Sequence, residues 1–294
     1  MQNNKDFGWF FTGFTEAEGC FNINIYKTKA GKYTAKLRFS IAIMQNDLDL
    51  LNKFKNYLNC GIISKPRSND MVHLTISKIS DINNILIPHF KNYPLRGNKL
   101  QDFYSWCVAA EIITSKSHLT SEGIVKLQDL FKNMNRSRVS LEDYLPSHCN
   151  KNSENYIPIN GNYISGFIAG DGSISIYPST LTLDNSKFCK IFISLTQHKN
   201  NLLLMNEIKE FFNINNKLNI YPNNTIRLLI ENKEFFRSTL IPFFKKYPLY
   251  GIKLKNLNKI IKILSVIDKY NINKNNVYTQ EIRQEIINIW FAES

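Results

Sequence analysis

Two carboxylic acids, Glu18 and Asp171, end two similar segments that lie about 153 residues apart. The segments read FFTGFTEAEG (residues 10–19) and YISGFIAGDG (residues 163–172), and each predicts a helix whose last turn carries the acid. The helix dipole disfavours negative charge at a C-terminal end, and neighbouring carboxylates repel each other. Such a pair requires cations, and its hard oxygens suit Mg²⁺, which often completes its coordination shell with water and phosphate oxygens.

Small residues four positions apart predict how the two acids come together. Gly13 with Ala17, and Gly166 with Gly170, lie on one face of their helices and let another backbone approach closely. We therefore expect the two helices to pack against each other. The glycine after each acid is typical of a residue that closes a helix in the left-handed conformation. One such helix is ordinary in a globular protein, whereas two copies favour a shared function.

Both segments resemble the LAGLIDADG motif of homing endonucleases, as FTGFTEAEG (residues 11–19) and ISGFIAGDG (residues 164–172). The first departs from the family pattern at Thr15 and has Glu18 in place of the usual aspartate. The second has Ala169 where an acid is common. Both copies keep the acid that binds metal in the family, so the resemblance is to the single-chain, two-motif type.

The resemblance implies a reaction and its metal ions. In the family, divalent ions held by the two acids support hydrolysis of both strands of a long double-stranded DNA target. The metal ligands here would be the carboxylates of Glu18 and Asp171 and the carbonyls of Ala17 and Gly170. We expect Mg²⁺ or Mn²⁺ to support cleavage, and Ca²⁺ to support binding without cleavage.

The repeat extends beyond the acidic segments. IPHFKNYPLRGNKL (residues 87–100) is echoed by IPFFKKYPLYGIKL (residues 241–254), and SIAIMQ (residues 40–45) by ISLTQ (residues 193–197). Because these landmarks recur in the same order, they predict two structurally equivalent halves related by a pseudo-twofold axis.

Two further pairs of residues occupy matched positions in these echoes. They are Gln45 with Gln197 and Lys99 with Lys253. By similarity to the family they are catalytic residues, in which glutamine orders water and lysine offsets charge in the transition state. The alternatives are a strand-end hydrogen bond for each glutamine and a solvated amine for each lysine.

The predicted fold is α+β, with two pseudo-twofold-related αββαββα halves. Alternating apolar and polar residues predict the strands, and apolar helical periodicity predicts the helices. In both halves the expected order is motif helix, two strands (21–26, 34–43; 173–177, 188–196), helix (47–58; 200–212), strand pair (61–76; 217–230) and later helix (100–113; 254–267). The motif helices would pack at the interface, and the antiparallel sheets would form a DNA-binding saddle.

The boundaries follow from composition. Residues 1–134 form the first half, ending in a helix at 121–134, and residues 163–294 form the second half. Residues 135–162 are rich in asparagine and serine, contain Pro146 and Pro158, and are expected to be a linker.

Charge points to a polyanionic partner. The formal net charge is +13 and the isoelectric point is about 9.4, which favours binding to double-stranded DNA. The alternative is a generic basic surface, because an AT-rich genome also enriches lysine and asparagine. Five cysteines and five histidines are dispersed without the spacing of a disulfide framework, a zinc site or a histidine nuclease motif.

Sequence-specific contacts are expected from polar side chains on the strands and loops. The expected DNA-contacting residues are Asn22, Asn24, Lys27, Lys29, Lys36, Arg38, Lys65, Arg67, Ser175, Tyr177, Ser179, Thr180, Lys190, Asn219, Tyr221 and Arg227. The halves differ at these positions, as in KTK (residues 27–29) against PST (residues 178–180). The expected target is therefore long and not palindromic.

Other functions of the same fold are an intron-encoded RNA maturase and a catalytically silent DNA-binding regulator. The presence of both acids favours a nuclease over a maturase or a silent regulator. A dual activity, with intron RNA as an additional partner, is the remaining alternative. We expect a monomer. We also expect no membrane partner, because no apolar run could span a bilayer and the N-terminus lacks the layout of a signal peptide. The AT-rich composition favours mitochondrial encoding.

Overall fold

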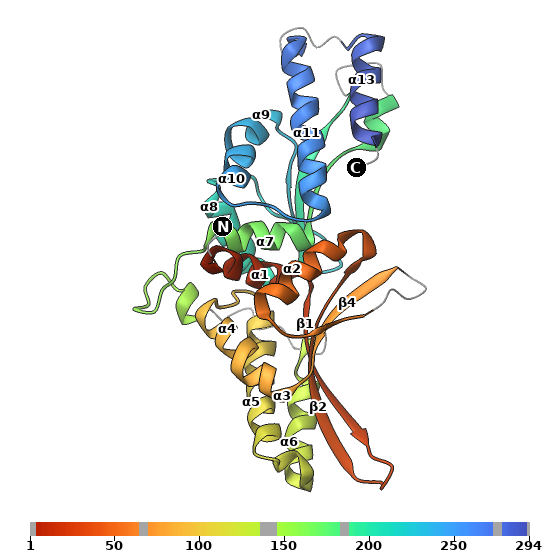
Figure 1. Cartoon of the computed structure of the whole chain (residues 1–294). Helices are drawn as coiled ribbons and strands as arrows, with labels where there is room; N and C mark the ends of the chain where they lie inside the picture. The colour runs from red at the N-terminus through yellow and green to blue at the C-terminus, as the bar shows by residue number, and fades with distance from the viewer. Residues whose placement is uncertain (1–3, 65–69, 136–145, 183–187, 273–277, 293–294) are drawn as a thin grey trace. The chain divides into compact units, whose positions relative to one another are not determined.

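The computed structural model describes residues 4–64, 70–135, 146–182, 188–272 and 278–292. These residues form two compact units (Figure 1). Unit 1 comprises residues 1–170 and 200–208, and unit 2 comprises residues 171–199 and 209–294.

Unit 1 begins with the first motif helix and continues through a sheet into a set of helices. Its elements are α1 (Asn4–Glu18), β1 (Gly19–Lys27), β2 (Tyr33–Met44), α2 (Leu48–Leu58), β3 (Ile62–Ile63), β4 (Met71–Ile76), α3 (Ile79–Asp81), α4 (Ile87–Asn92), α5 (Lys99–Thr114) and α6 (Ser121–Lys132). The second motif helix, α7 (Gly161–Asp171), belongs to unit 1 except for its last residue. The first part of α8 (Leu202–Phe211) belongs to unit 1 as well.

Unit 2 repeats the same order of strands. Its elements are β5 (Gly172–Ile176), β6 (Ile191–His198), β7 (Asn219–Ile220), β8 (Thr225–Ile230), α9 (Lys233–Phe235), α10 (Ile241–Lys246), α11 (Ile252–Lys269) and α13 (Gln280–Phe291). The strand orders are β1-β2-β4-β3 and β5-β6-β8-β7, and every pairing is antiparallel. The α+β class and the repeated topology expected from the sequence are therefore confirmed.

Each sheet has one buried face and one mainly polar face. In β2 the side chains of Leu37, Phe39 and Ile41 are buried, and the residues between them are exposed or half-buried. Helices cover the buried face: the indole of Trp106 on α5 donates to the Asn22 carbonyl at 3.2 Å. In unit 2 the Asn256 amide on α11 donates to a β5 carbonyl at 3.1 Å.

In each repeat, a helix interrupted by a π-helical turn comes before the segment that contains Lys99 or Lys253. The turns are Ile82–Leu86, before α4, and Phe236–Leu240, before α10. Pro88 and Pro242 lie in the first turn of the following helix. Proline has no amide hydrogen and collides with the preceding helical turn, so the backbone widens locally.

The two motif helices pack backbone to backbone within unit 1. A Cβ atom added at Gly13 would collide with the carbonyl oxygen of Tyr163, and one added at Gly166 would collide with the carbonyl oxygen of Phe10. An added Cβ at Gly170 would overlap the side chain of Ala17. The close approach expected from the small residues is therefore confirmed.

The glycines that follow the acids differ from the expectation of a left-handed helix end. Gly19 and Gly172 are the first residues of β1 and β5, and neither is among the described glycines with positive φ. At Gly19 an added Cβ would overlap the Thr15 backbone and side chain. Glycine is needed there because the chain passes from helix to strand without a turn.

His89 is a neutral residue in the aromatic core of unit 1. Its Nε2 lies 3.0 Å from Thr12 Oγ1, and its Nδ1 lies 3.2 Å from the Tyr57 hydroxyl. The Thr12 hydroxyl donates its proton to the Tyr93 carbonyl at 3.0 Å, so His89 Nε2 must be the donor to Thr12. Burial lowers the pKa of His89 to about 3.

All five cysteines are unpaired thiols, as expected. Within the described part of the chain, no helix combines the length and hydropathy needed to cross a membrane.

His89 should make stability depend on pH. The folded pKa of about 3 lies below the unfolded value of about 6.5. Its contribution to stability is thus fully present above pH 6.5 and is lost as the pH falls toward 3. His89→Gln should flatten the pH dependence of the unfolding free energy in this window, by up to about 1.4 kcal/mol per pH unit. A constant difference between wild type and variant in urea unfolding from pH 4 to 7 would contradict this.

Gly166→Ala should destabilise unit 1. Helix propensity alone predicts a gain of about 1 kcal/mol for this change, whereas overlap with the Phe10 backbone predicts a loss of about 2 kcal/mol or more. The sign of the change in the free energy of unfolding decides between them, and a stabilised variant would show that the helices do not need this contact.

Candidate functional site

The first acid, Glu18, is the exposed last residue of α1. The ammonium of Lys99, the first residue of α5, donates to the carbonyls of Glu16 and Ala17, at 2.6 Å in each case. The motif helix and α5 therefore place a positive charge against the backbone just before Glu18. Cationic charge is favourable at this helix end, where the carbonyl groups lack partners within the helix.

Glu16 fixes the position of Lys99, although the motif contains it only two residues before Glu18. Its side chain is 1% exposed and accepts hydrogen bonds from the amides of Arg96 (2.9 Å), Gly97 (3.0 Å) and Lys99 (3.3 Å). It also accepts from the Tyr163 hydroxyl at 3.0 Å. The carboxylate lies at the start of α5, where the helix dipole favours negative charge.

The Glu16 carboxylate also affects its tyrosine partner. Burial, together with the neighbouring charge of Glu16, raises the pKa of Tyr163 well above its usual value. Tyr163 therefore remains a protonated donor. Neither Glu16 nor Tyr163 is among the site residues expected from the sequence, although an acid two residues before Glu18 in the same motif was a usable signal.

Arg96 ties the same segment to α8 within unit 1. Its guanidinium makes two hydrogen bonds to the Glu207 carboxylate, at 2.6 and 2.8 Å, and a third to the Ile157 carbonyl at 3.0 Å. The backbone amide of Asn98 donates to Asn201 Oδ1 at 2.8 Å. A bidentate, buried pair of this kind is geometrically specific, so the residues leading into Lys99 are firmly positioned.

The second acid, Asp171, is the half-buried last residue of α7. Gln197 Nε2 on β6 donates to Asp171 Oδ2 at 2.6 Å. The ammonium of Lys253, near the start of α11, donates to the Gly172 carbonyl. The structure therefore brings Gln197 to the second acid and Lys253 to the residue that follows it.

The donor atoms at the two acids are of the type that Mg²⁺ prefers. Glu18 and Asp171 supply carboxylate oxygens, and the residues before them, Ala17 and Gly170, supply backbone carbonyls. Among the described residues, no group of three or more His, Cys, Asp or Glu side chains could hold a metal ion. A hard cation with several water ligands fits such a sparse oxygen set.

The strand register does not match Gln45 with Gln197, which corrects the pairing expected from the sequence. The backbone amide of Gln45 donates to the Asp70 carbonyl at 2.8 Å, and the backbone amide of Lys199 donates to the Asn224 carbonyl at 2.8 Å. Gln45 therefore corresponds to Lys199, and Gln197 lies two positions earlier on its strand. The sequence comparison aligned the shared glutamine, whereas the backbone hydrogen bonds follow a hairpin that is one residue longer in the second repeat.

The polar face of the unit 1 sheet carries four of the expected DNA-contacting residues: Asn22, Asn24, Lys36 and Arg38. Lys27 lies on the opposite face, paired with Tyr33, and its ammonium is 5.2 Å from the centre of that ring. Lys29 lies in the exposed turn between β1 and β2. Lys65 and Arg67 lie outside the described residues.

In unit 2 the corresponding face carries Ser175, Tyr177, Arg227 and Asn219. Ser179, Lys190 and Tyr221 are exposed beyond the strand ends. Thr180 is instead 7% exposed: its hydroxyl donates to the Tyr177 carbonyl at 2.7 Å and accepts from the Lys190 amide at 3.0 Å. Through these bonds Thr180 stabilises the connection between β5 and β6.

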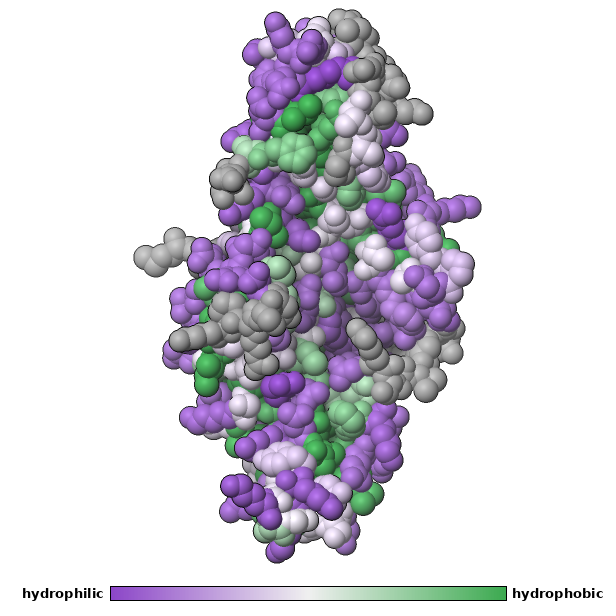
Figure 2. All heavy atoms as spheres, turned by 90° about the vertical axis from the view of Figure 1, so that its right-hand side faces the viewer, coloured by the Kyte–Doolittle hydropathy of each residue, from purple (hydrophilic) through white to green (hydrophobic). Residues whose placement is uncertain are grey.

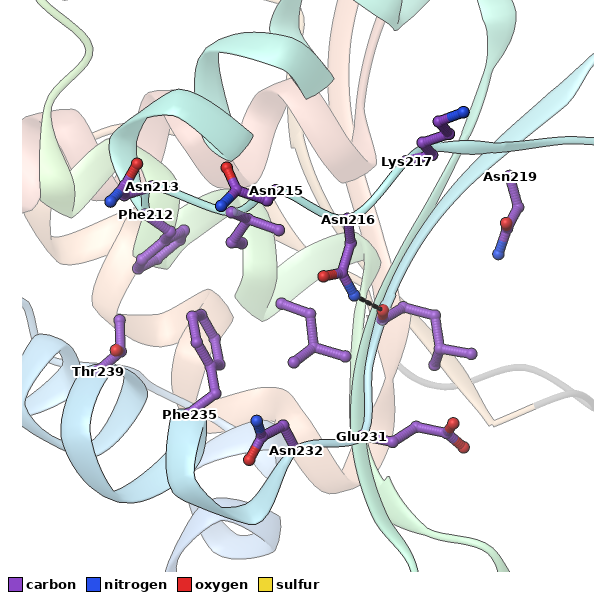
Figure 3. A pocket seen from close by; sticks show the side chains of 13 residues that line it. Phe212, Asn213, Asn215, Asn216, Lys217, Asn219, Glu231, Asn232, Phe235 and Thr239 are labelled. Carbon is purple, nitrogen blue, oxygen red and sulfur yellow. Dashed lines mark hydrogen bonds between the residues drawn. The ribbon is translucent and has the colours of Figure 1, made fainter.

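The visible surface in Figure 2 is mostly hydrophilic, with hydrophobic patches between the polar residues. A separate pocket of about 950 Å³ lies within unit 2, between the segment after α8 and the end of β8 (Figure 3). Two lining rings, Phe212 and Phe235, pack edge to face with their centres 6.2 Å apart, and the Asn216 side chain donates to the Leu229 carbonyl at 3.4 Å. Neither acid lines this pocket.

Comparison with known proteins gives a consistent result. A family model described as LAGLIDADG endonuclease matches residues 11–110 and again residues 164–264. A relative from Neurospora crassa, named probable intron-encoded endonuclease 3, is 30% identical over 278 residues, which cover 88% of this chain and 50% of the relative. The chain thus spans about half the length of that relative.

Solved structures agree in fold. The I-LtrWI LAGLIDADG homing endonuclease bound to target DNA has a TM-score of 0.82 and 27% identity, covering 99% of each chain. I-SmaMI bound to an uncleaved DNA target in the presence of calcium ions has a TM-score of 0.79 and 24% identity, covering 98% of each chain, and shows likeness of fold.

Neutralising the two glutamates of the first motif should have unequal effects on stability. Glu16→Gln should lower the free energy of unfolding by about 2 kcal/mol, because three amides and a hydroxyl lose a buried anionic acceptor. The matched control, Glu18→Gln, changes an exposed residue and should stay within about 0.5 kcal/mol of wild type. Equal losses in thermal or urea unfolding would contradict this assignment.

Proposed function

The chain belongs to the LAGLIDADG endonuclease family, and on that premise we propose that it is a site-specific homing endonuclease hydrolysing both strands of a long, non-palindromic double-stranded DNA target. The observation that carries the proposal is that each motif helix ends in an acid, Glu18 or Asp171, beside a lysine that donates to the motif backbone. Relatives named as intron-encoded endonucleases support the same function.

The carboxylates of Glu18 and Asp171, with the carbonyls of Ala17 and Gly170, would hold divalent ions. When bound, Mg²⁺ or Mn²⁺ supplies Lewis-acid stabilisation of phosphate charge and lowers the pKa of coordinated water. Ca²⁺ should support binding without cleavage, consistent with the uncleaved I-SmaMI complex. Although the Ala17 carbonyl accepts from Lys99, a carbonyl oxygen has a second lone pair for a cation.

The remaining site residues position these groups and balance charge. Gln197 holds one oxygen of Asp171 and so fixes the rotamer of that carboxylate. Lys99 and Lys253 bring ammonium groups to the two motifs, where they offset the charge that develops on a phosphate in the transition state. Gln45 is proposed to order water, although its backbone position corresponds to Lys199.

The polar faces of the two sheets are the proposed DNA-contacting surface. Lysine and arginine neutralise phosphates, while asparagine and arginine read base edges.

Because the chain supplies two motifs, we propose that it acts as a monomer, with repeats at residues 1–134 and 163–294 joined by residues 135–162. We also propose mitochondrial encoding, which fits the fungal intron-encoded relative. That relative does not favour a maturase or a silent regulator, and nothing observed supports an RNA partner.

Neutralising either acid should abolish cleavage but not binding. With a target selected from a library of randomised DNA duplexes in Mg²⁺, Glu18→Gln and Asp171→Asn should each reduce cleavage by about 100-fold or more. Binding measured in Ca²⁺ should remain within about tenfold of wild type, because the base-contacting strands are unchanged. A chelator should stop cleavage by the wild type. A wild-type protein that binds the selected DNA without cutting it in Mg²⁺ or Mn²⁺ would overturn the nuclease assignment.

A further inference from the structure

The polar faces of the two sheets differ at structurally equivalent positions. Phe39 pairs with Ile76 in unit 1, and Ile193 pairs with Ile230 in unit 2. This register makes two pairs of residues equivalent: Arg38 with Phe192, and Thr75 with Leu229. One sheet therefore presents a cation and a hydroxyl where the other presents two apolar side chains.

The apolar residues lie on the face that points away from the core. Phe192 pairs with Ser175, and Leu229 pairs with Ser194, so all four share one side of the sheet. The alternate strand positions, such as Ile191 and Leu228, are buried on the other side. Phe192 and Leu229 are only half-buried.

A third residue completes the apolar cluster. Tyr177 continues the line of β5, with its amide donating to the Lys190 carbonyl at 2.9 Å. Its ring centre lies 4.4 Å from that of Phe192. Tyr177, Phe192 and Leu229 occupy diagonally neighbouring positions of the sheet and form an apolar strip, with Ser175 and Arg227 on the same face. Glu231, which follows β8, and Arg227 interact with the Tyr177 hydroxyl at one edge of this strip.

An apolar strip on a DNA-contacting face has one natural partner among the base edges. In the major groove, thymine alone presents a methyl group, and phenylalanine is among the side chains that contact it. Arginine at the equivalent position of unit 1 matches the N7 and O6 acceptors of guanine. Charge alone cannot distinguish base pairs in this way, because phosphate contacts carry no sequence information.

We propose that Phe192 and Leu229 select thymine methyl groups in the half-site bound by unit 2, whereas Arg38 selects guanine in the half-site bound by unit 1. This inference rests on the proposed DNA-cleaving function and assigns specificity within it. The two half-sites would then differ in base composition as well as in sequence.

Single-atom changes in the DNA test the assignment. Each thymine of the selected target is replaced in turn by deoxyuridine, which lacks only the methyl group, and affinity is measured in Ca²⁺. With the wild type, one or more replacements in one half-site should weaken binding about fourfold each, as expected for one buried methyl group. Phe192→Ala and Leu229→Ala should each bind thymine and deoxyuridine equally at the position they contact.

Two further variants separate the inference from general damage. Phe192→Leu keeps an apolar contact and should keep the sensitivity to deoxyuridine. The matched control, Arg38→Ala, should keep it too, but should lose discrimination against 7-deazaguanine in the other half-site. If the wild type binds and cuts its target while the deoxyuridine scan is flat, or unchanged in both alanine variants, the inference is wrong. A wild type that binds no duplex would instead contradict the proposed function.

Discussion

The rest of the structure depends on the backbone contact between α1 and α7. At Gly13 and Gly166 each helix approaches the other so closely that a methyl group would collide with a carbonyl oxygen. This contact fixes the rotation of both helices, because only their glycine faces can meet at that distance. The rotation in turn determines where each helix presents its final acid. Glycine is unfavourable in a helix interior, so these positions give up local stability for tertiary packing.

Around this contact, the two acids are supported by different means. The first motif has a second acid, Glu16, whose buried carboxylate holds the start of α5 and thereby Lys99. The second motif has Ala169 at the equivalent position, and Lys253 donates to the Gly172 carbonyl. Asp171 is held from the sheet by Gln197. The repeats therefore share topology and acids, while their hydrogen-bond networks have diverged.

Much of this could be predicted from residue patterns. Alternation identified the strands, and the echoed segment ending in KL gave Lys99 and Lys253, whose ammonium groups each donate to the backbone of a motif. Residue identity alone misaligned the two glutamines. In the strand register Gln197 is equivalent to Ile43 of the first repeat, because the hairpin before it is one residue longer in the second repeat. Two further residues were placed only by the structure. Lys27 pairs with Tyr33 on the core side of the sheet, and Thr180 is buried in the hairpin that it stabilises.

The sequence by itself determined the repeat, the two acids and the small residues that let their helices meet. These features are local, since periodicity and side-chain size are readable over ten residues. Tertiary structure alone decided that Glu16 is a buried anchor and Glu18 an exposed acid, two positions apart in one motif. It also decided which strand residues share a face across the sheet. The burial of Glu16 depends on partners 80 or more residues away, Arg96 and Lys99, whose backbone amides reach Glu16 only once the sheet has brought α5 to the motif helix. The shared faces depend on the register of hydrogen bonds between strands.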